Sequence, residues 1–178
     1  MITKQQYDQA KTSTLDYFVK ASIAITEEEK DRIEVADFGL SDLKNTGLQI
    51  LTYVNTERVC AKELVLTPFQ TCPEHRHPSL GDVTGKEETF RCRYGVVYLY
   101  VSGEPTANPV VNPPEGTYTV FHEITLRPGE QYTLSPNTLH WFKSGADGAV
   151  VSEFSTRSND DADIFTDPRI ARTPEITE

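Results

Sequence analysis

Residues 71–95, TCPEHRHPSLGDVTGKEETFRCRYG, form the stretch around which the rest of the chain is organised. His75 and His77 lie two positions apart in it, and a carboxylate pair, Glu87 and Glu88, follows after a glycine-containing loop. Side chains two positions apart on an extended chain leave the same face, so both imidazoles can converge on one ion. The stretch therefore predicts a metal site.

A further ligand is expected from His140, far downstream in SPNTLHWF. Three imidazoles and one carboxylate suit a divalent transition ion, and the residues alone leave Mn, Fe, Co, Ni and Zn open. A purely structural ion is the alternative, but structural sites are typically closed and often rich in cysteine, whereas this set has no thiolate. Cys72 is near enough to be a soft ligand, yet the set is complete without it. The remaining histidine, His122, is expected to be a strand residue without a metal role.

Most of the chain predicts β-structure. Short runs rich in Val, Tyr, Phe and Thr are separated by Pro and Gly, a pattern typical of strands. Many short strands without intervening helices indicate a sandwich or barrel. The Pro-rich insert 104–116 is expected to be a surface loop. The strand candidates are residues 48–55, 58–68, 89–103, 117–129, 131–136, 138–145 and 149–158.

The N-terminal part predicts two helices that pack outside the barrel. Residues 3–20 contain few helix breakers and carry a ragged helical stripe. A second helix is expected to start at Thr26, with Glu29 completing a capping box, and to stop at Gly39. The polar tail after Ser158 is expected to wrap the outside of the barrel or a neighbouring molecule.

The length of 178 residues indicates one domain. We expect residues 1–178 to form it, with a helical segment at 1–40, a β-barrel at 45–157 and a C-terminal tail at 158–178. The net charge of −10, without clustered Lys and Arg, argues against a nucleic-acid partner. No segment approaches the ~20 apolar residues of a membrane span, and the polar N-terminus lacks a secretory apolar run.

We therefore expect a cytoplasmic protein that does not bind membranes. Cysteine use agrees, because Cys60, Cys72 and Cys92 are an odd and scattered set that does not form a disulfide framework. A neutral sugar would meet no electrostatic penalty from the acidic chain.

Two further charged residues are candidates for acid–base chemistry. Lys86 lies two positions before Glu88 and would share its inward face if the strand has already begun; otherwise it belongs to a charged loop. Glu153 lies in the apolar run AVVSEFST with the parity of Val151 and Ser155. A carboxylate on an inward face must be paired or functional, because burying it alone is costly. The alternative is a solvated outward face.

The spacing of these residues resembles the two motifs of cupins. The first cupin motif has two histidines one residue apart, then a glutamate, six residues and a glycine; Gly95 stands at that distance from Glu88 and so selects Glu88 over Glu87. Gly129, Pro136 and His140 match the second motif, although the glycine between proline and histidine is missing and the spacing is one residue short. The resemblance implies a mainly β, single-domain cupin fold, a double-stranded β-helix or jelly-roll-like barrel, with N-terminal helices added.

Within the cupins the chain is most similar to D-lyxose ketol-isomerases. The residues that carry this resemblance are TCPEHRHP (71–78), GKEETF (85–90), SPNTLHWF (135–142) and SEFST (152–156). It implies a divalent metal, usually Mn, on His75, His77, Glu88 and His140. It also implies a monosaccharide substrate, D-lyxose with D-xylulose or also D-mannose with D-fructose, and a homodimer.

In such an isomerase the metal acts as a Lewis acid on the open-chain sugar. Glu153 would take the C2 proton and return it to C1, and Lys86 would hydrogen-bond the moving oxygen or relay its proton. The residues leave two other functions open, an iron-dependent cupin oxygenase and a non-catalytic sugar- or metal-binding module. An oxygenase has less need of the Glu153 and Lys86 pair, and in a binding module Glu153 would be replaceable.

Overall fold

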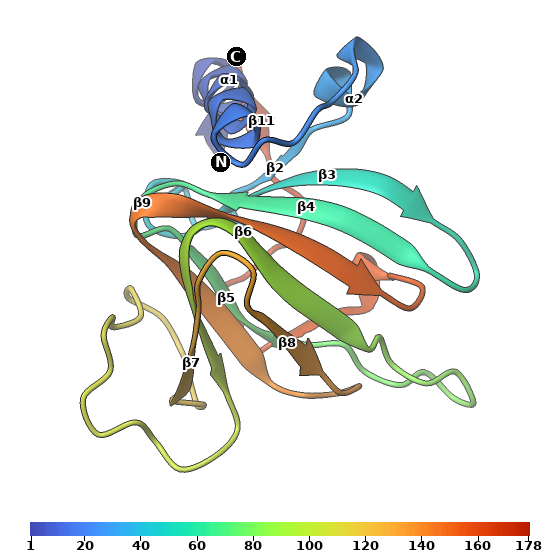
Figure 1. The fold of residues 1–178 in the computed structure, drawn as a ribbon, viewed down its shortest axis with the longest axis vertical. Coiled ribbons are helices and arrows are strands. Elements are labelled where there is room, and N and C mark those ends of the chain that lie inside the picture. Colours follow the sequence, from blue (N-terminus) through green and yellow to red (C-terminus); the bar gives the residue numbers. More distant parts are fainter.

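The computed structural model describes residues 1–178, and its architecture confirms a mainly β fold with helices added at the N-terminus (Figure 1). The helices are α1 (Lys4–Lys20), α2 (Glu27–Asp31) and the short 3-10 helix η1 (Asp160–Ala162). The strands are β1 (Ile2–Thr3), β2 (Glu34–Ala36), β3 (Leu48–Asn55), β4 (Cys60–Leu66), β5 (Thr71–Arg76), β6 (Glu88–Val101), β7 (His122–Leu126), β8 (Gln131–Leu134), β9 (His140–Ser155), β10 (Ile164–Phe165) and β11 (Ile176–Thr177).

Two long antiparallel strands, β6 and β9, form the central pair of the nine-stranded sheet. Their pairing runs from Glu88 opposite Ser155 to Val101 opposite His140. On its other side β9 pairs with β4 and β5, and β6 pairs with β7 and β8. The strands β3 and β2 extend the sheet beyond β4, and β10 adds to the free side of β5.

Both long strands bend back on themselves, and glycines make the bend possible (Figure 1). Gly95 has φ +69° and Gly148 has φ +73°, a region that side chains disfavour. A Cβ on Gly95 would lie 2.0 Å from the carbonyl oxygen of Gly148, so the two backbones touch at the corner. The bend returns the Glu88 end of β6 to the neighbourhood of His140, at the opposite end of the pairing.

Apolar side chains fill the inside of the curl and also cover its outer face under α1. On the outer face Tyr17 and Phe18 of α1 pack against Leu51, Val65 and Val150 of the sheet. The predicted helix over 3–20 and its packing outside the barrel are therefore confirmed. The inner cluster consists mainly of residues from β3, β4, β6 and β9, with Leu64, Phe90, Cys92, Phe142 and Val151 among them.

The predicted second helix is only partly right. The capping box of Thr26 and Glu29 is present, but α2 ends at Asp31 and does not continue to Gly39. Residues Glu34–Ala36 instead form β2, which pairs with β3. The reason is tertiary, because Val35 and Ala36 are buried and the edge of β3 supplies their backbone hydrogen bonds.

Strand boundaries differ from the prediction in three places. The runs 138–145 and 149–158 are one strand, β9, because the polypeptide passes the bend without leaving the sheet. The run 117–129 is a strand only over His122–Leu126, since the amides of Thr119 and Val120 donate to the buried Glu74 carboxylate and not to a neighbouring strand. The segment 71–76 was not among the strand candidates and forms β5.

Candidate metal centre and active site

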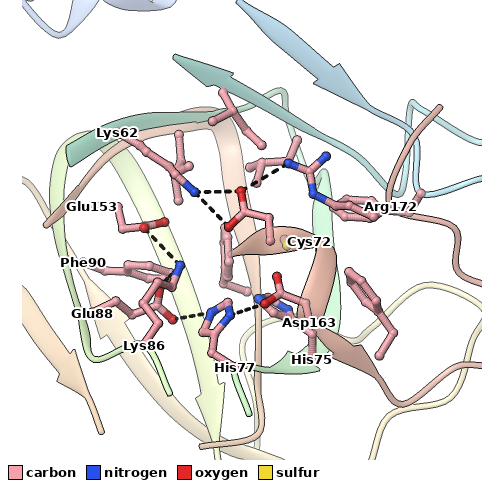
Figure 2. Close-up of a pocket in the computed structure, with 17 residues that line it drawn as sticks. Lys62, Cys72, His75, His77, Lys86, Glu88, Phe90, Glu153, Asp163 and Arg172 are labelled. Atoms are coloured by element: carbon pink, nitrogen blue, oxygen red, sulfur yellow. Dashed lines mark hydrogen bonds and ion pairs between the residues drawn. The ribbon is translucent and has the colours of Figure 1, made fainter. Parts of the chain in front are cut away.

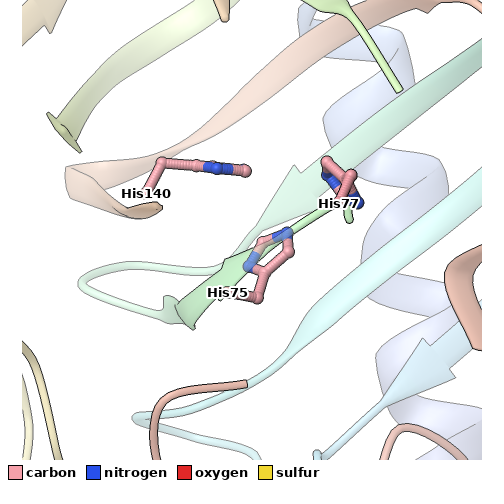
Figure 3. Close-up of side chains that lie close together, drawn as sticks. All are labelled: His75, His77 and His140. Atoms are coloured by element: carbon pink, nitrogen blue, oxygen red, sulfur yellow. The ribbon is translucent and has the colours of Figure 1, made fainter. Parts of the chain in front are cut away.

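Three histidine side chains meet at one end of the curled sheet. His75 on β5 is the direct antiparallel neighbour of His140 on β9, and His77 follows two positions later on the same face. Their candidate ligand nitrogens all lie within 4.8 Å of one another, and all three residues are buried. Figure 3 shows the three rings turned toward a common centre.

Backbone carbonyls fix the orientation of two of these rings. His75 Nδ1 lies 2.8 Å from the carbonyl oxygen of Pro73, and His140 Nδ1 lies 3.0 Å from that of Thr138. A carbonyl oxygen only accepts, so the proton belongs on Nδ1 in both residues. The lone pair of each Nε2 is thereby left for a ligand, the arrangement common to metal-binding histidines. Burial and the neighbouring His140 and His77 also lower the pKa of His75 well below its usual value.

A carboxylate on each side holds the third ring. His77 Nδ1 lies 2.5 Å from Oδ1 of Asp163, and its Nε2 lies 3.0 Å from Oε1 of Glu88. Burial would lower the pKa of His77, but Glu88 and Asp163 raise it to about 9. Negative charge thus lies on both sides of this ring.

Glu88 lies beside the three histidines, and its neighbour Glu87 does not. The Glu88 side chain is buried, with Oε1 3.2 Å from His140 Nε2, whereas Glu87 is exposed. Burial would raise the pKa of Glu88, yet Lys86 and His77 hold it well below its usual value, so the carboxylate is charged. His140 Nε2 makes no hydrogen bond although it is buried. An orphaned lone pair beside a charged carboxylate and two further imidazoles fits a divalent transition ion.

Lys86 and Glu153 form a buried ion pair next to these donors (Figure 2). Lys86 Nζ lies 2.8 Å from Oε2 of Glu88 and 3.0 Å from Oε1 of Glu153. Although β6 begins only at Glu88, the Lys86 ammonium still reaches inward. Burial would lower the pKa of Lys86, but Glu153 and Glu88 raise it well above its ordinary value.

Glu153 lies on the inner face of the curl, and the solvated alternative is excluded because only 3 % of the residue is exposed. It stands opposite Phe90 on β6 and Lys62 on β4. Ser155 Oγ donates to its Oε1 at 3.2 Å. The alternation of side chains along the strand therefore correctly predicted that Glu153 points inward.

The C-terminal segment closes the pocket, and sequence reasoning missed this role. We expected the tail on the outside of the barrel or on a neighbour, but β10 pairs with β5 beside His75, and Asp163 reaches His77. Asp160 and Arg172 from the same segment also line the pocket. The tail gave no periodic signal; its acidic run NDDAD was the only hint that it carries chemistry.

Cys72, weighed as a soft ligand, and His122, expected to be a strand residue, both have defined positions. Cys72 is buried and lines the pocket, and burial raises the pKa of its thiol well above the usual value, which makes it a weak ligand. His122 lies on β7, exposed, with Nδ1 3.0 Å from the carbonyl oxygen of Glu104.

All three cysteines are free, as expected. No helix has the length and apolar character needed to cross a membrane.

Comparison with known proteins identifies the family. A family model described as D-lyxose isomerase matches residues 106–178. A D-lyxose/D-mannose isomerase of Thermosediminibacter oceani is 64% identical over 179 residues, covering 99% of both chains. A D-lyxose ketol-isomerase of a Thermofilum species is 60% identical, again over 99% of both chains.

A solved structure shares the fold at much lower identity. The L-ribose isomerase of Cellulomonas parahominis superposes with a TM-score of 0.75 and 18% sequence identity, covering 99% of this chain and 98% of that one. At this identity the likeness concerns the fold alone. The near full-length identity to the two sequence relatives shows that the chain belongs to the D-lyxose ketol-isomerase family of aldose–ketose isomerases.

Proposed function

We propose that the protein is a divalent-metal-dependent isomerase that interconverts D-lyxose and D-xylulose, with D-mannose and D-fructose as a second pair. The names of its relatives support this substrate class. The single observation that carries the proposal is the buried pair of Glu153 and Lys86 beside Glu88 and the three clustered histidines. Family membership favours the isomerase over the oxygenase and the binding module considered from the sequence.

His75, His77, Glu88 and His140 would hold the metal, for which we propose Mn. When bound, the ion supplies Lewis-acid polarisation of the sugar carbonyl and its neighbouring hydroxyl. Nitrogen and oxygen donors without a thiolate are compatible with Mn, and also with Co, Fe, Zn and Ni.

Glu153 is the proposed base. Its carboxylate takes the proton from C2 of the open-chain aldose, and the C–H electron pair becomes the C1–C2 double bond of an enediol. The same carboxylate then returns the proton to C1, while one hydroxyl proton moves from O2 to O1, so the overall reaction only relocates two hydrogens. Its place on the inner face of β9, 3.0 Å from the Lys86 ammonium, keeps this carboxylate beside the reacting carbons.

Lys86 is the proposed partner of the sugar oxygens on which negative charge develops during the reaction. Its ammonium already bridges Glu88 and Glu153, and its raised pKa keeps it protonated at neutral pH. A charged donor at this place stabilises negative charge that develops on O1 and O2.

The test is isomerisation in D2O. Metal-stripped protein is reconstituted with Mn and incubated with D-lyxose, and NMR follows xylulose and deuterium at C1. Xylulose that carries deuterium supports proton transfer through an exchangeable base, and xylulose without it indicates a hydride shift or a shielded proton. Absence of any ketose from D-lyxose and D-mannose would refute the proposed function.

We also infer a homodimer. The sheet has strand edges at β2, β7 and β8 that a second copy can cover. Sedimentation velocity distinguishes a dimer from the 20.0 kDa monomer.

A further inference from the structure

A second charged cluster lies across the pocket from the histidines. Lys62 Nζ lies 2.8 Å from Oδ2 of Asp160, and Arg172 Nη2 lies 3.5 Å from the same oxygen. Figure 2 shows Lys62 and Arg172 along one side of the pocket, with His75 and His77 along the opposite side. All three cluster residues line the same pocket as the metal-type donors.

The walls between these two ends are mostly apolar. Phe38, Leu48, Ile50, Leu64 and Phe165 line the pocket and offer no side-chain hydrogen bonds. A polyhydroxy ligand therefore finds polar partners mainly at the two ends. The position of the reactive end is set by Glu153 and Lys86. Lys62 is the cross-strand neighbour of Glu153, whereas Arg172 lies on the far side of the pocket from Glu153 (Figure 2).

Arg172 has unused hydrogen-bonding capacity. Its side chain is only 19% exposed, and its nearest carboxylate oxygens are 3.5 Å away on Asp160 and 3.7 Å away on Glu34. Neither distance is a hydrogen bond, so the N–H donors of this partly exposed guanidinium have no side-chain partner at bonding distance. These donors are therefore available to a ligand in the pocket that Arg172 lines.

Two neighbouring side chains fix the position of the Asp160 carboxylate. Lys62 Nζ and Ser158 Oγ both donate to it, and Lys62 is itself buried. Burial would lower the pKa of Lys62, but Glu153 and Asp160 raise it, so the ammonium keeps its charge. A fixed carboxylate acceptor beside free guanidinium donors matches a hydroxyl group, which both donates and accepts.

We propose that Arg172, supported by Asp160, binds the terminal hydroxyl of the open-chain sugar, at the end opposite the reacting carbonyl. This inference rests on the proposed function and adds a specificity-determining residue to it. Arg172 thereby favours sugars whose last hydroxyl lies at the right distance from the reactive carbons. The C-terminal tail supplies both Arg172 and Asp160 to this contact.

The experiment compares wild type and Arg172→Met on D-lyxose and on 5-deoxy-D-lyxose. For wild type we expect kcat/KM to fall at least tenfold when the terminal hydroxyl is removed. For Arg172→Met we expect KM for D-lyxose to rise at least tenfold, kcat and Mn content to be retained, and the penalty for the missing hydroxyl to disappear. Arg157→Met is the matched control, because its ion pair with Glu57 is exposed and outside this pocket.

The inference is overturned if Arg172→Met keeps the wild-type KM and the full penalty for 5-deoxy-D-lyxose. Should Arg172→Met not fold, Arg172→Lys keeps the charge beside Asp160 but lacks the planar fork, and the same comparison decides. Failure of the proposed function looks different, because wild type itself would then turn over neither sugar. Binding of the polyol xylitol by calorimetry gives a readout that does not depend on turnover.

Discussion

Replacing Asp163 should weaken metal binding without touching any metal-type donor. Of the three histidines, His75 and His140 direct Nδ1 to backbone carbonyls, which no substitution removes. Only His77 depends on a side chain, the Asp163 carboxylate at 2.5 Å. Asp163 comes from the C-terminal tail, so the same substitution tests whether the tail belongs to the site.

The expected size follows from the buried hydrogen bond. The side chains of His77 and Asp163 are 9% and 7% exposed, so water cannot replace the lost acceptor well. Outer partners of metal-binding histidines are typically worth about 10–100-fold in metal affinity, or roughly 1.4–2.7 kcal/mol. Asp163→Asn keeps one acceptor oxygen and should fall near the lower bound. Asp163→Ala leaves Nδ1–H unpaired and should fall near the upper one.

The assay is titration of metal-stripped protein with Mn in competition with a chromogenic chelator. Asp161→Asn serves as the matched control, because Asp161 is exposed and only two positions away in the same segment. Melting curves of the metal-free variants establish that each is folded. A Kd for Mn within twofold of wild type in folded Asp163→Ala would refute the reasoning that this carboxylate orients His77.

Three further predictions follow from individual residues. Glu153→Gln should bind Mn and sugar as wild type does but lose at least about 100-fold in kcat, as loss of a general base costs; turnover near the wild-type rate would remove Glu153 from the mechanism. Burial would raise the pKa of Asp160, but Lys62 and Lys86 hold it below its usual 3.8, so its stabilisation is present above about pH 4 and is lost as the pH falls further. Urea unfolding should therefore show Asp160→Asn about 1–2 kcal/mol less stable than wild type at neutral pH, with a smaller gap near pH 2; a gap that does not shrink in acid would contradict this. Gly95→Ala places a Cβ 2.0 Å from the Gly148 carbonyl oxygen, so it should lower the stability by about 3 kcal/mol and also reduce Mn uptake. Gly145→Ala, whose nearest contact is 3.6 Å, should change little. Equal stability of the two variants would show that the bend tolerates a side chain.

The sequence by itself determined the features that depend on local geometry. The spacing of His75 and His77 put both rings on one face, and the parity of Glu153 turned it inward, because side chains alternate along any extended chain. The capping box at Thr26 was equally visible, since it joins groups only three residues apart. The position of Gly95 could be picked out by its distance from Glu88, but the bend that requires a glycine there could not be predicted.

Only the tertiary structure decided what depends on pairing between distant segments. Residues 34–36 left the helix for a strand because the edge of β3 stabilises them there, and no local propensity encodes that edge. Asp163 and Arg172 reached the pocket because β10 pairs with β5 and carries the tail across it. Periodicity is fixed by covalent geometry and can be read along the chain. These contacts instead join residues far apart in the sequence, such as His77 and Asp163, 86 positions apart, through burial and hydrogen bonding summed over the whole fold.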